Sequence, residues 1–398
     1  MTIVPFKKKN TKGKEKGRVA YWGKLYAHRA RIALFILIVL AAIVTVFLII
    51  RHQMKNRVYD SYEVVSTVER SGAISSQVLA FGSSFISYND DGIRCTDASG
   101  KDVWNHPYEM QSPMVKVNGS YVAVADKNGR NIYIFSSSGL VGTVETTDPI
   151  DSITLSQSGE VLAVVDGGNV TPIYLYASNG TMLVSFRTTM SKSGYPMSLA
   201  ISDDGKLVEI AYLYMDSATL MSKVAFYNFG EVGQNKADNL VGGNDYQGEV
   251  VPVVGFLDNA TAFAVGTGRI MFYEGKETPR NTSDSMIYDK IHSVFYGSEH
   301  VGLVFVENNA DGRYRMDVYA KNGKISGQLQ FDLEYANVFF SNGRIVIYNA
   351  SSCLIYTTEG KLVYEGDFDD AVILMMPTAN AAKYILVTGD SIDTIQLR

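Results

Sequence analysis

The chain has 398 residues, of which 46% are hydrophobic and 11% aromatic. This composition is ample for a packed core and excludes wholesale disorder. The formal net charge of −5 hides an asymmetry, because residues 1–58 hold 13 of the 36 basic residues and one of the 41 acidic ones. Residues 59–398, with 23 basic and 40 acidic residues, are therefore strongly acidic, which argues against nucleic acid as a partner.

The first element is an apolar stretch of nineteen residues, Ile32 to Ile50, which has no charge and one polar member, Thr45. As a helix it would be about 28 Å long, close to the hydrocarbon thickness of a bilayer. A soluble helix of this length normally has a polar face, and a cleavable signal peptide has a shorter apolar region followed by small residues. The pattern therefore predicts an uncleaved transmembrane helix over residues 32–50, with the lipid bilayer as a partner.

The charges on either side of this stretch predict its orientation. Ten basic residues precede it and three follow in residues 51–58. Because positive flanks stay in the cytoplasm, we expect residues 1–31 to form a disordered cytoplasmic tail. Residues 51–58 would then be a juxtamembrane linker, and residues 59–398 an extracytoplasmic domain in a single-pass protein of the cell membrane.

The domain consists of short apolar runs with period-two alternation, separated by Gly, Asn, Asp and Ser turns, which is typical of strands and hairpins. One unit recurs in which apolar residues stand seven and five positions before a glycine. Its five regular copies end at Gly100, Gly139, Gly180, Gly323 and Gly360, and two less regular copies end near Gly230 and Gly275. A hairpin precedes each copy, and eight such hairpins can be counted, the last at Asn380-Ala381.

The number of units predicts a closed ring. The eighth hairpin is followed by one more strand, Ile392–Leu397, after which the chain stops, and a spare strand, Tyr62–Val68, stands alone before the first hairpin. We therefore expect an all-β fold, a β-propeller of eight four-stranded blades in which Tyr62–Val68 completes the last blade and removes its free edge. The alternatives are seven blades, an elongated solenoid or two sandwiches.

The two cysteines, Cys95 and Cys353, stand at apolar repeat positions in the third strands of blades that are not neighbours. This placement favours small buried side chains over a disulfide or a catalytic thiol. His106, His292 and His300 are expected in separate blades, without the spacing of a metal site.

Other candidate chemistry is weak. Turns such as Asn89-Asp90-Asp91-Gly92 are rich in oxygen ligands, but they lack the spacing of a calcium loop and are ordinary hairpin turns. The chain contains no Gly-x-Ser-x-Gly elbow and no glycine-rich phosphate loop. We therefore predict no catalytic, cofactor-binding or metal-binding residues, and no cofactor. The longest irregular stretch, Asn228–Gly248, is interpreted as a loop that contacts a partner.

The segment Gly92–Trp104, with its Asp97-Ala98-Ser99-Gly100-Lys101 turn, resembles one blade of the quinoprotein-type and WD40-like propellers. The segment Tyr356–Tyr364 is similar. The layout of basic tail, apolar span and propeller resembles an uncharacterised family of membrane-anchored propeller proteins from Gram-positive bacteria. The resemblance implies a membrane location and exterior placement, and no assigned activity. Because Trp104 is the only tryptophan of the domain and no two cysteines are adjacent, a quinone cofactor is not expected.

Our leading functional hypothesis is a binding or scaffold module for a protein or cell-envelope ligand, without catalysis. The first alternative is a hydrolase or lyase that acts on envelope polymers, with its site in the propeller channel. The second is an exterior sensor that signals through a partner.

Overall fold

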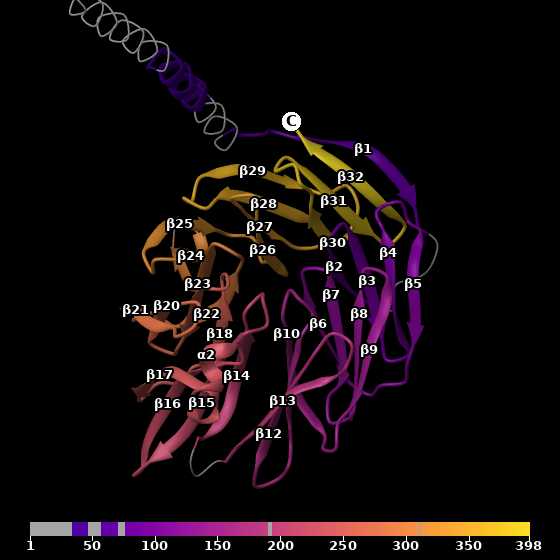
Figure 1. The fold of residues 1–398 in the computed structure, drawn as a ribbon. Coiled ribbons are helices and arrows are strands. Elements are labelled where there is room, and N and C mark those ends of the chain that lie inside the picture. Colours follow the sequence, from indigo (N-terminus) through magenta and orange to yellow (C-terminus); the bar gives the residue numbers. More distant parts are fainter. Residues whose placement is uncertain (1–33, 47–56, 71–75, 190–192, 310–311) are drawn as a thin grey trace, which may run out of the picture. The chain divides into compact units, whose positions relative to one another are not determined.

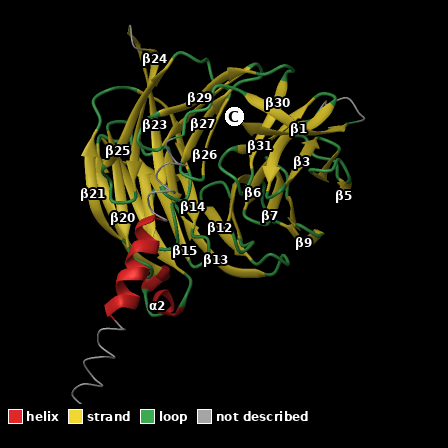
Figure 2. Cartoon of the chain, turned by 90° about the horizontal axis from the view of Figure 1, so that it is seen from above, coloured by secondary structure: helices red, strands yellow, loops and turns green. Residues whose placement is uncertain are grey.

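The structure is a computed structural model that describes residues 34–46, 57–70, 76–189, 193–309 and 312–398. Val58–Arg398 form one compact unit, and residues 1–57 belong to another. Strands joined by short loops make up nearly all of the larger unit (Figure 2).

The described part of the N-terminal unit is a helix over residues 34–46, which lies inside the predicted span. Within the described residues, no helix combines the length and the apolar character needed to cross a membrane. Residues 32–33 and 47–50 of the predicted span lie outside the described residues, as do the predicted tail and most of the predicted linker.

The described strands form eight four-stranded antiparallel sheets, each of which is one blade. The blades are numbered in chain order. Blade 1 contains β2 (Gln77–Phe81), β3 (Ser84–Asn89), β4 (Gly92–Asp97) and β5 (Asp102–Pro107), and blade 2 contains β6 (Pro113–Asn118), β7 (Tyr121–Asp126), β8 (Asn131–Ser136) and β9 (Gly139–Glu145). Blade 3 contains β10 (Ile150–Leu155), β11 (Val161–Val165), β12 (Thr171–Tyr176) and β13 (Met182–Thr188), and blade 4 contains β14 (Tyr195–Ile201), β15 (Leu207–Asp216), β16 (Thr219–Asn228) and β17 (Leu240–Gln247).

Blade 5 contains β18 (Val253–Phe256), β19 (Thr261–Val265), β20 (Arg269–Glu274) and β21 (Arg280–Met286), and blade 6 contains β22 (Ile291–Tyr296), β23 (His300–Asn309), β24 (Gly312–Ala320) and β25 (Ile325–Phe331). Blade 7 contains β26 (Asn337–Ser341), β27 (Arg344–Tyr348), β28 (Ser352–Thr357) and β29 (Leu362–Asp367), and blade 8 contains β30 (Val372–Pro377), β31 (Lys383–Thr388), β32 (Ser391–Leu397) and β1 (Tyr62–Glu69). Short helical turns, α2 (Glu231–Gln234) and the 3-10 helix η1 (Ala237–Asn239), interrupt blade 4.

The predicted closure of the ring is confirmed. Strand β1 pairs antiparallel with β32 from Tyr62 opposite Leu397 to Glu69 opposite Ser391. Figure 1 shows the indigo β1 lying along the yellow β32, so the two ends of the domain share blade 8. The eight-bladed ring is therefore correct, and the seven-bladed, solenoid and sandwich alternatives are wrong.

The hydrophobic core is divided among the interfaces between blades. Among the described residues there are eight apolar clusters, and each joins two neighbouring blades. One of them packs Phe85 of blade 1 against Met376 and Ile392 of blade 8. Because a single blade cannot bury both faces of its sheet, all eight interfaces are needed to complete the core.

The repeated glycine follows the third strand of each regular copy, and its turn packs against the outer strand of the preceding blade. Gly180 and Gly360 have positive φ angles of 85° and 90°, which favour glycine. A Cβ atom at Gly180 would lie 2.6 Å from the Thr143 carbonyl oxygen in β9, and one at Gly360 would lie 2.1 Å from that of Gln328 in β25. The regular recurrence of this glycine in the sequence therefore reflects contacts between blades as well as turn geometry.

Gly360→Ala is expected to destabilise the protein much more than Gly82→Ala. Both glycines have positive φ, but a Cβ atom at Gly82 would meet nothing within 4 Å. The backbone cost of alanine is about 1 kcal/mol at either site, and the contact with Gln328 should add about 1–3 kcal/mol to the loss at Gly360. Chemical denaturation of both variants measures the difference. Equal losses would mean that the turn geometry alone requires the glycine.

The alternation of strand direction gives the ring two faces. The turn face holds the turns that join first to second and third to fourth strands, and the connection face holds the second-to-third turns and the links between blades. The described turns of the turn face hold nine acidic and seven basic residues, whereas those of the connection face hold twelve acidic and four basic residues. The excess negative charge of the domain is therefore greater on the connection face.

Candidate functional site

A recess of about 510 Å³ opens at the centre of the ring on the turn face. It is lined by residues of the first strands of blades 2 to 6, which are β6, β10, β14, β18 and β22, and of the turns that follow them. Strand β10 contacts both β6 and β14, and β14 contacts β18, so first strands lie side by side around the axis. The recess is therefore the mouth of the central channel.

Hydrogen bonds between blades hold the wall of the recess in place. The side-chain nitrogen Nδ2 of Asn118 in blade 2 donates to the Leu155 carbonyl oxygen in blade 3 at 3.0 Å. The hydroxyl of Ser198 in blade 4 accepts a hydrogen bond of 3.2 Å from the backbone N–H of Val254 in blade 5. These bonds fix the spacing of neighbouring first strands, so the recess is rigid.

Two charged side chains of opposite sign line the recess. Lys116 is exposed on β6, and Asp203 begins the turn after β14. Burial raises the pKa of Asp203, and the nearby carboxylates Asp258 and Asp204 raise it further, while a hydrogen bond with Asn118 lowers it. The carboxyl of Asp203 is therefore easier to protonate than an exposed aspartate.

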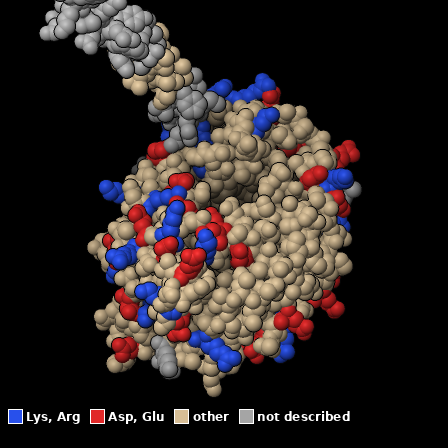
Figure 3. Space-filling model, viewed as in Figure 1, with Lys and Arg blue, Asp and Glu red and all other residues tan. Residues whose placement is uncertain are grey.

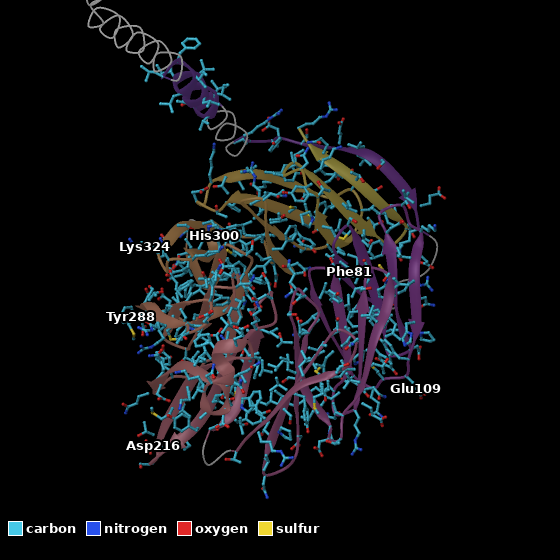
Figure 4. The ribbon with its side chains drawn as sticks, in the orientation of Figure 1. Phe81, Glu109, Asp216, Tyr288, His300 and Lys324 are labelled. Carbon is cyan, nitrogen blue, oxygen red and sulfur yellow. The ribbon has the colours of Figure 1, made fainter. Side chains whose placement is uncertain are left out.

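An ion-pair cluster stands beside this mouth and ties blade 6 to blade 5. The Nζ atom of Lys321 lies 2.9 Å from Asp258 Oδ2 and 2.8 Å from Glu299 Oε1. Partial burial opposes the charge of Lys321, but the hydrogen bonds to these two carboxylates outweigh burial and raise its pKa. The neighbouring His300 and Lys324 are labelled in Figure 4.

The lining suits the binding of a polar group with an apolar part. Tyr296 is 49% exposed, and its ring packs edge-on against Phe263 with the centroids 5.0 Å apart. Beside it lie the amides of Asn118 and Gln157 and the charges of Lys116 and Asp203. Such a set can donate and accept hydrogen bonds with peptide or sugar groups while an aromatic ring covers their apolar side.

A buried carboxyl lies behind this wall. Glu209 on β15 is fully buried, and neither of its carboxylate oxygens has a hydrogen-bond partner. Burial raises the pKa of Glu209 well above its usual value. The backbone N–H of Gly255, between the lining residues Val254 and Phe256, opposes this rise by a smaller amount, although it does not meet ordinary hydrogen-bond geometry. Glu209 therefore binds a proton more tightly than an exposed glutamate.

The prediction that the three histidines lie in separate blades is wrong for two of them. His292 is on β22 and His300 on β23, both in blade 6, because the first hairpin of that blade lies between them. His106 is on β5 in blade 1, where its ring lies 5.1 Å from that of Tyr133. The described residues contain no group of three His, Cys, Asp or Glu side chains arranged to hold a metal ion.

The interpretation of Asn228–Gly248 as an irregular loop is wrong for the second half of the stretch. Its second half is β17, the outer strand of blade 4, which pairs with β16. The polar and glycine-rich composition reflects close packing, because a Cβ atom at Gly243 would lie 2.6 Å from the Val224 carbonyl oxygen, and one at Gly242 2.9 Å from that of Pro279. An outer strand with many exposed positions needs few apolar residues, so its sequence resembles that of a loop.

The acidic turn Asn89–Gly92 is a hairpin turn, as predicted. The side-chain oxygen of Asn89 accepts hydrogen bonds from the backbone N–H groups of Asp91 at 3.0 Å and Gly92 at 3.1 Å. In the turn that resembles quinoprotein-type blades, Asp97 Oδ1 accepts in the same way from Ser99 at 2.8 Å and Lys101 at 3.0 Å. The aspartate of this motif therefore stabilises the turn.

The cysteines are buried, free and in non-adjacent blades, as predicted. Burial raises the pKa of Cys95 to about 11 and that of Cys353 further. We expect neither thiol to react with a maleimide at pH 7.5 in the folded protein and both to react after unfolding in denaturant, because the reactive thiolate is absent. Mass spectrometry counts the labels, and rapid labelling of the folded chain would contradict the buried placement.

Sequence reasoning did not identify Lys116, Asp203 or Glu209 as notable. The first two come together only when the ring closes, since they stand in different blades. The sequence does indicate that Glu209 is a buried carboxyl, because it is the only charged residue in the apolar run Leu207–Leu213.

Comparison with known structures supports the fold. The crystal structure of Sqt1 from Chaetomium thermophilum is similar with a TM-score of 0.53 at 11% identity, over 84% of this chain and 98% of that one. Sqt1 from Saccharomyces cerevisiae has a TM-score of 0.50 at 11% identity, over 85% and 98%. BamB from Moraxella catarrhalis has a TM-score of 0.48 at 12% identity, over 85% and 100%, and this TM-score is too low to support the fold. At these identities the likeness concerns the fold alone.

Among curated proteins, none matches this sequence. A protein-family model does match, and it covers residues 55–397, which is the entire propeller except its last residue. The chain therefore belongs to the family of unknown function DUF5711.

Proposed function

We propose that this protein is a non-enzymatic binding module held at the outer surface of a cell membrane, whose channel mouth binds a protein or cell-envelope ligand. The observation that carries the proposal is the polar recess on the turn face, where five blades place hydrogen-bonding groups, two opposite charges and an aromatic ring around one rigid opening. Binding sites with a preformed geometry bind without a large ordering cost.

The membrane part of the proposal is supported by sequence. The uncharged residues 32–50 serve as the anchor, the basic tail stays in the cytoplasm, and the propeller lies outside. Nucleic acid is not proposed as a partner, because the turns of both faces have net negative charge.

Orientation is tested by labelling intact cells with a maleimide that does not cross membranes. Tyr288→Cys, at a position that is 91% exposed on the domain (Figure 4), is expected to react from outside. Thr11→Cys should react only after permeabilisation. The opposite pattern would reverse the orientation, and release of the chain from membranes by alkaline carbonate would refute the anchor.

Binding at the recess is tested by charge reversal. Lys116→Glu is expected to reduce capture of the ligand by the detergent-solubilised chain about tenfold or more, since losing a charge in a binding recess costs at least 1.4 kcal/mol. Lys127→Glu is the matched control, because Lys127 is an exposed lysine of the same blade on the connection face. Capture is quantified by crosslinking in cells followed by mass spectrometry. Equal losses in both variants, or none in either, would exclude the recess as the site.

One observation favours a second candidate, the envelope-polymer hydrolase or lyase. The raised pKa of Asp203 is what a general acid in such a channel needs. If the second candidate is right, the purified chain releases soluble fragments from isolated envelope polymer, and Asp203→Asn abolishes the release. Ligand capture without release supports the binding module.

A further inference from the structure

Exposed aliphatic side chains stand near the beginning of the fourth strand in seven of the eight blades, and Leu240 on β17, Ile325 on β25 and Leu362 on β29 are among them. One run of them covers four consecutive blades, 8, 1, 2 and 3, with exposed fractions from 39% to 55%. They include Val64 on β1, Val103 on β5, Val141 on β9, and Met182 and Leu183 on β13. We call this set the rim arc. Since a fourth strand begins next to the turn face, the arc lies on that side of the ring.

The surroundings of the rim arc carry little net charge. The third-to-fourth turns of blades 1 to 3, residues 98–101, 137–138 and 177–181, contain one charged residue, Lys101, and no acidic one. The corresponding turns of blades 4, 5 and 7 each contain a glutamate. Figure 3 shows a broad surface with few charged side chains on the side of blades 1 and 2, whereas charges crowd the side of blades 5 and 6.

Two acidic residues next to the arc are each paired with an arginine. Asp102 precedes Val103, and its Oδ2 atom lies 3.5 Å from Arg94 Nη1. Glu63 precedes Val64 and forms an ion pair with Arg398. Repulsion between these carboxylates and an anionic surface is therefore reduced.

The chain itself limits what can cover the arc. Strand β1 forms one end of the arc and is also the first strand after the proposed anchor, with eleven residues between Ile50 and Tyr62. Eleven residues extend at most about 40 Å. If residues 32–50 are the anchor, this length keeps the domain within reach of the bilayer. An uncovered apolar rim on edge strands would invite aggregation.

We propose that the rim arc rests against the lipid bilayer, with its aliphatic side chains in the headgroup region. The contact would hold the ring in one orientation on the membrane, with the acidic connection face turned away from the lipid. An apolar edge without unpaired acidic groups is the chemistry that a lipid surface accepts. This proposal rests on the proposed anchor.

The test uses the full chain in nanodiscs of phosphatidylcholine and phosphatidylglycerol. Single cysteines are introduced as Val141→Cys and Leu183→Cys on the arc, with Tyr288→Cys as the control, and labelled with an environment-sensitive fluorophore. The native cysteines are buried and stay unlabelled. We expect a blue shift and severalfold quenching by spin-labelled lipid at the two arc positions and neither effect at the control. Because both arc side chains are about half exposed, the variants should fold, which circular dichroism checks.

The remaining outcomes overturn the proposal in distinguishable ways. Labels that remain in water at all three positions, in a chain that resists carbonate extraction, refute the rim contact and leave the anchor intact. A shift that persists in detergent without lipid and grows with protein concentration indicates a second copy of the chain on the arc. A chain that carbonate extracts refutes the anchor, and the rim proposal with it.

Discussion

Val68→Asp is expected to open the ring and to lower the free energy of unfolding by about 3 kcal/mol or more. Val68 lies on β1 opposite Ile392, and it belongs to the apolar cluster that joins blades 8 and 1. A Cβ atom at Gly100 would come within 3.0 Å of its Cγ1 atom, so the turn of blade 1 packs directly on this side chain. A carboxylate here would lose water without gaining a partner.

The loss should be cooperative, because β1, from the beginning of the domain, completes the last blade and so closes the ring. Without it, β32 becomes a free edge and the interface between blades 8 and 1 loses its outer strand. We therefore expect aggregation on size-exclusion chromatography and rapid proteolysis within blade 8, in addition to the lower denaturation midpoint.

Ser66→Asp is the matched control for this prediction. Ser66 is an exposed residue on the same strand, opposite Thr394, and an aspartate there stays in water. Its midpoint should change little. If both variants unfold at the same denaturant concentration as the natural chain, the closure of the ring by β1 contributes little to stability.

Glu209→Leu is expected to stabilise the protein, by about 1–3 kcal/mol at pH 8, because it removes a buried carboxyl that has no hydrogen-bond partner. Leucine has a similar volume and suits the surrounding cluster, in which Ala211 and Phe226 pack against Val254. Glu109→Leu is the control, since Glu109 is exposed (Figure 4) and its replacement should leave stability nearly unchanged.

The pH dependence has a definite sign. Burial raises the pKa of Glu209 in the folded state, so the folded state binds more protons than the unfolded state above the unfolded pKa. The stability of the natural chain therefore falls as pH rises, by up to about 1.4 kcal/mol per pH unit, from the unfolded pKa near 4.5 up to the folded pKa.

Glu209→Gln isolates this ionisation, because it keeps a polar group but cannot lose a proton. The stability difference between Glu209→Gln and the natural chain should grow as pH rises, as measured by urea denaturation between pH 5 and 9. Parallel curves over this range would mean that Glu209 is already ionised in the folded protein.

The turns on the connection face could be predicted from neighbouring residues, whereas the recess on the turn face could not. Hairpin residues such as Asn89 bond to their own backbone, so their role follows from neighbouring residues alone. Lys116 and Asp203 are 87 residues apart, and nothing local relates them. They share a recess only because three blades place their first strands around one axis.

The mistaken reading of Asn228–Gly248 has a related cause. An inner strand is buried on both faces and therefore has a continuous apolar run, as in Val161–Val165. An outer strand such as β17 has exposed positions on both faces, and its glycines are required by contacts with β16 and with blade 5. Local composition cannot separate such a strand from a loop, because the partner that stabilises it is elsewhere in the chain.

The amino-acid sequence by itself indicated eight blades, the buried positions of the five regular third strands and the strand that closes the ring, because each depends on a repeat between neighbouring residues. The tertiary structure alone decided between eight and seven blades, which charges meet at the channel mouth and that Glu209 is buried without a partner. These features arise between blades, and their energies depend on distances that only the closed ring sets.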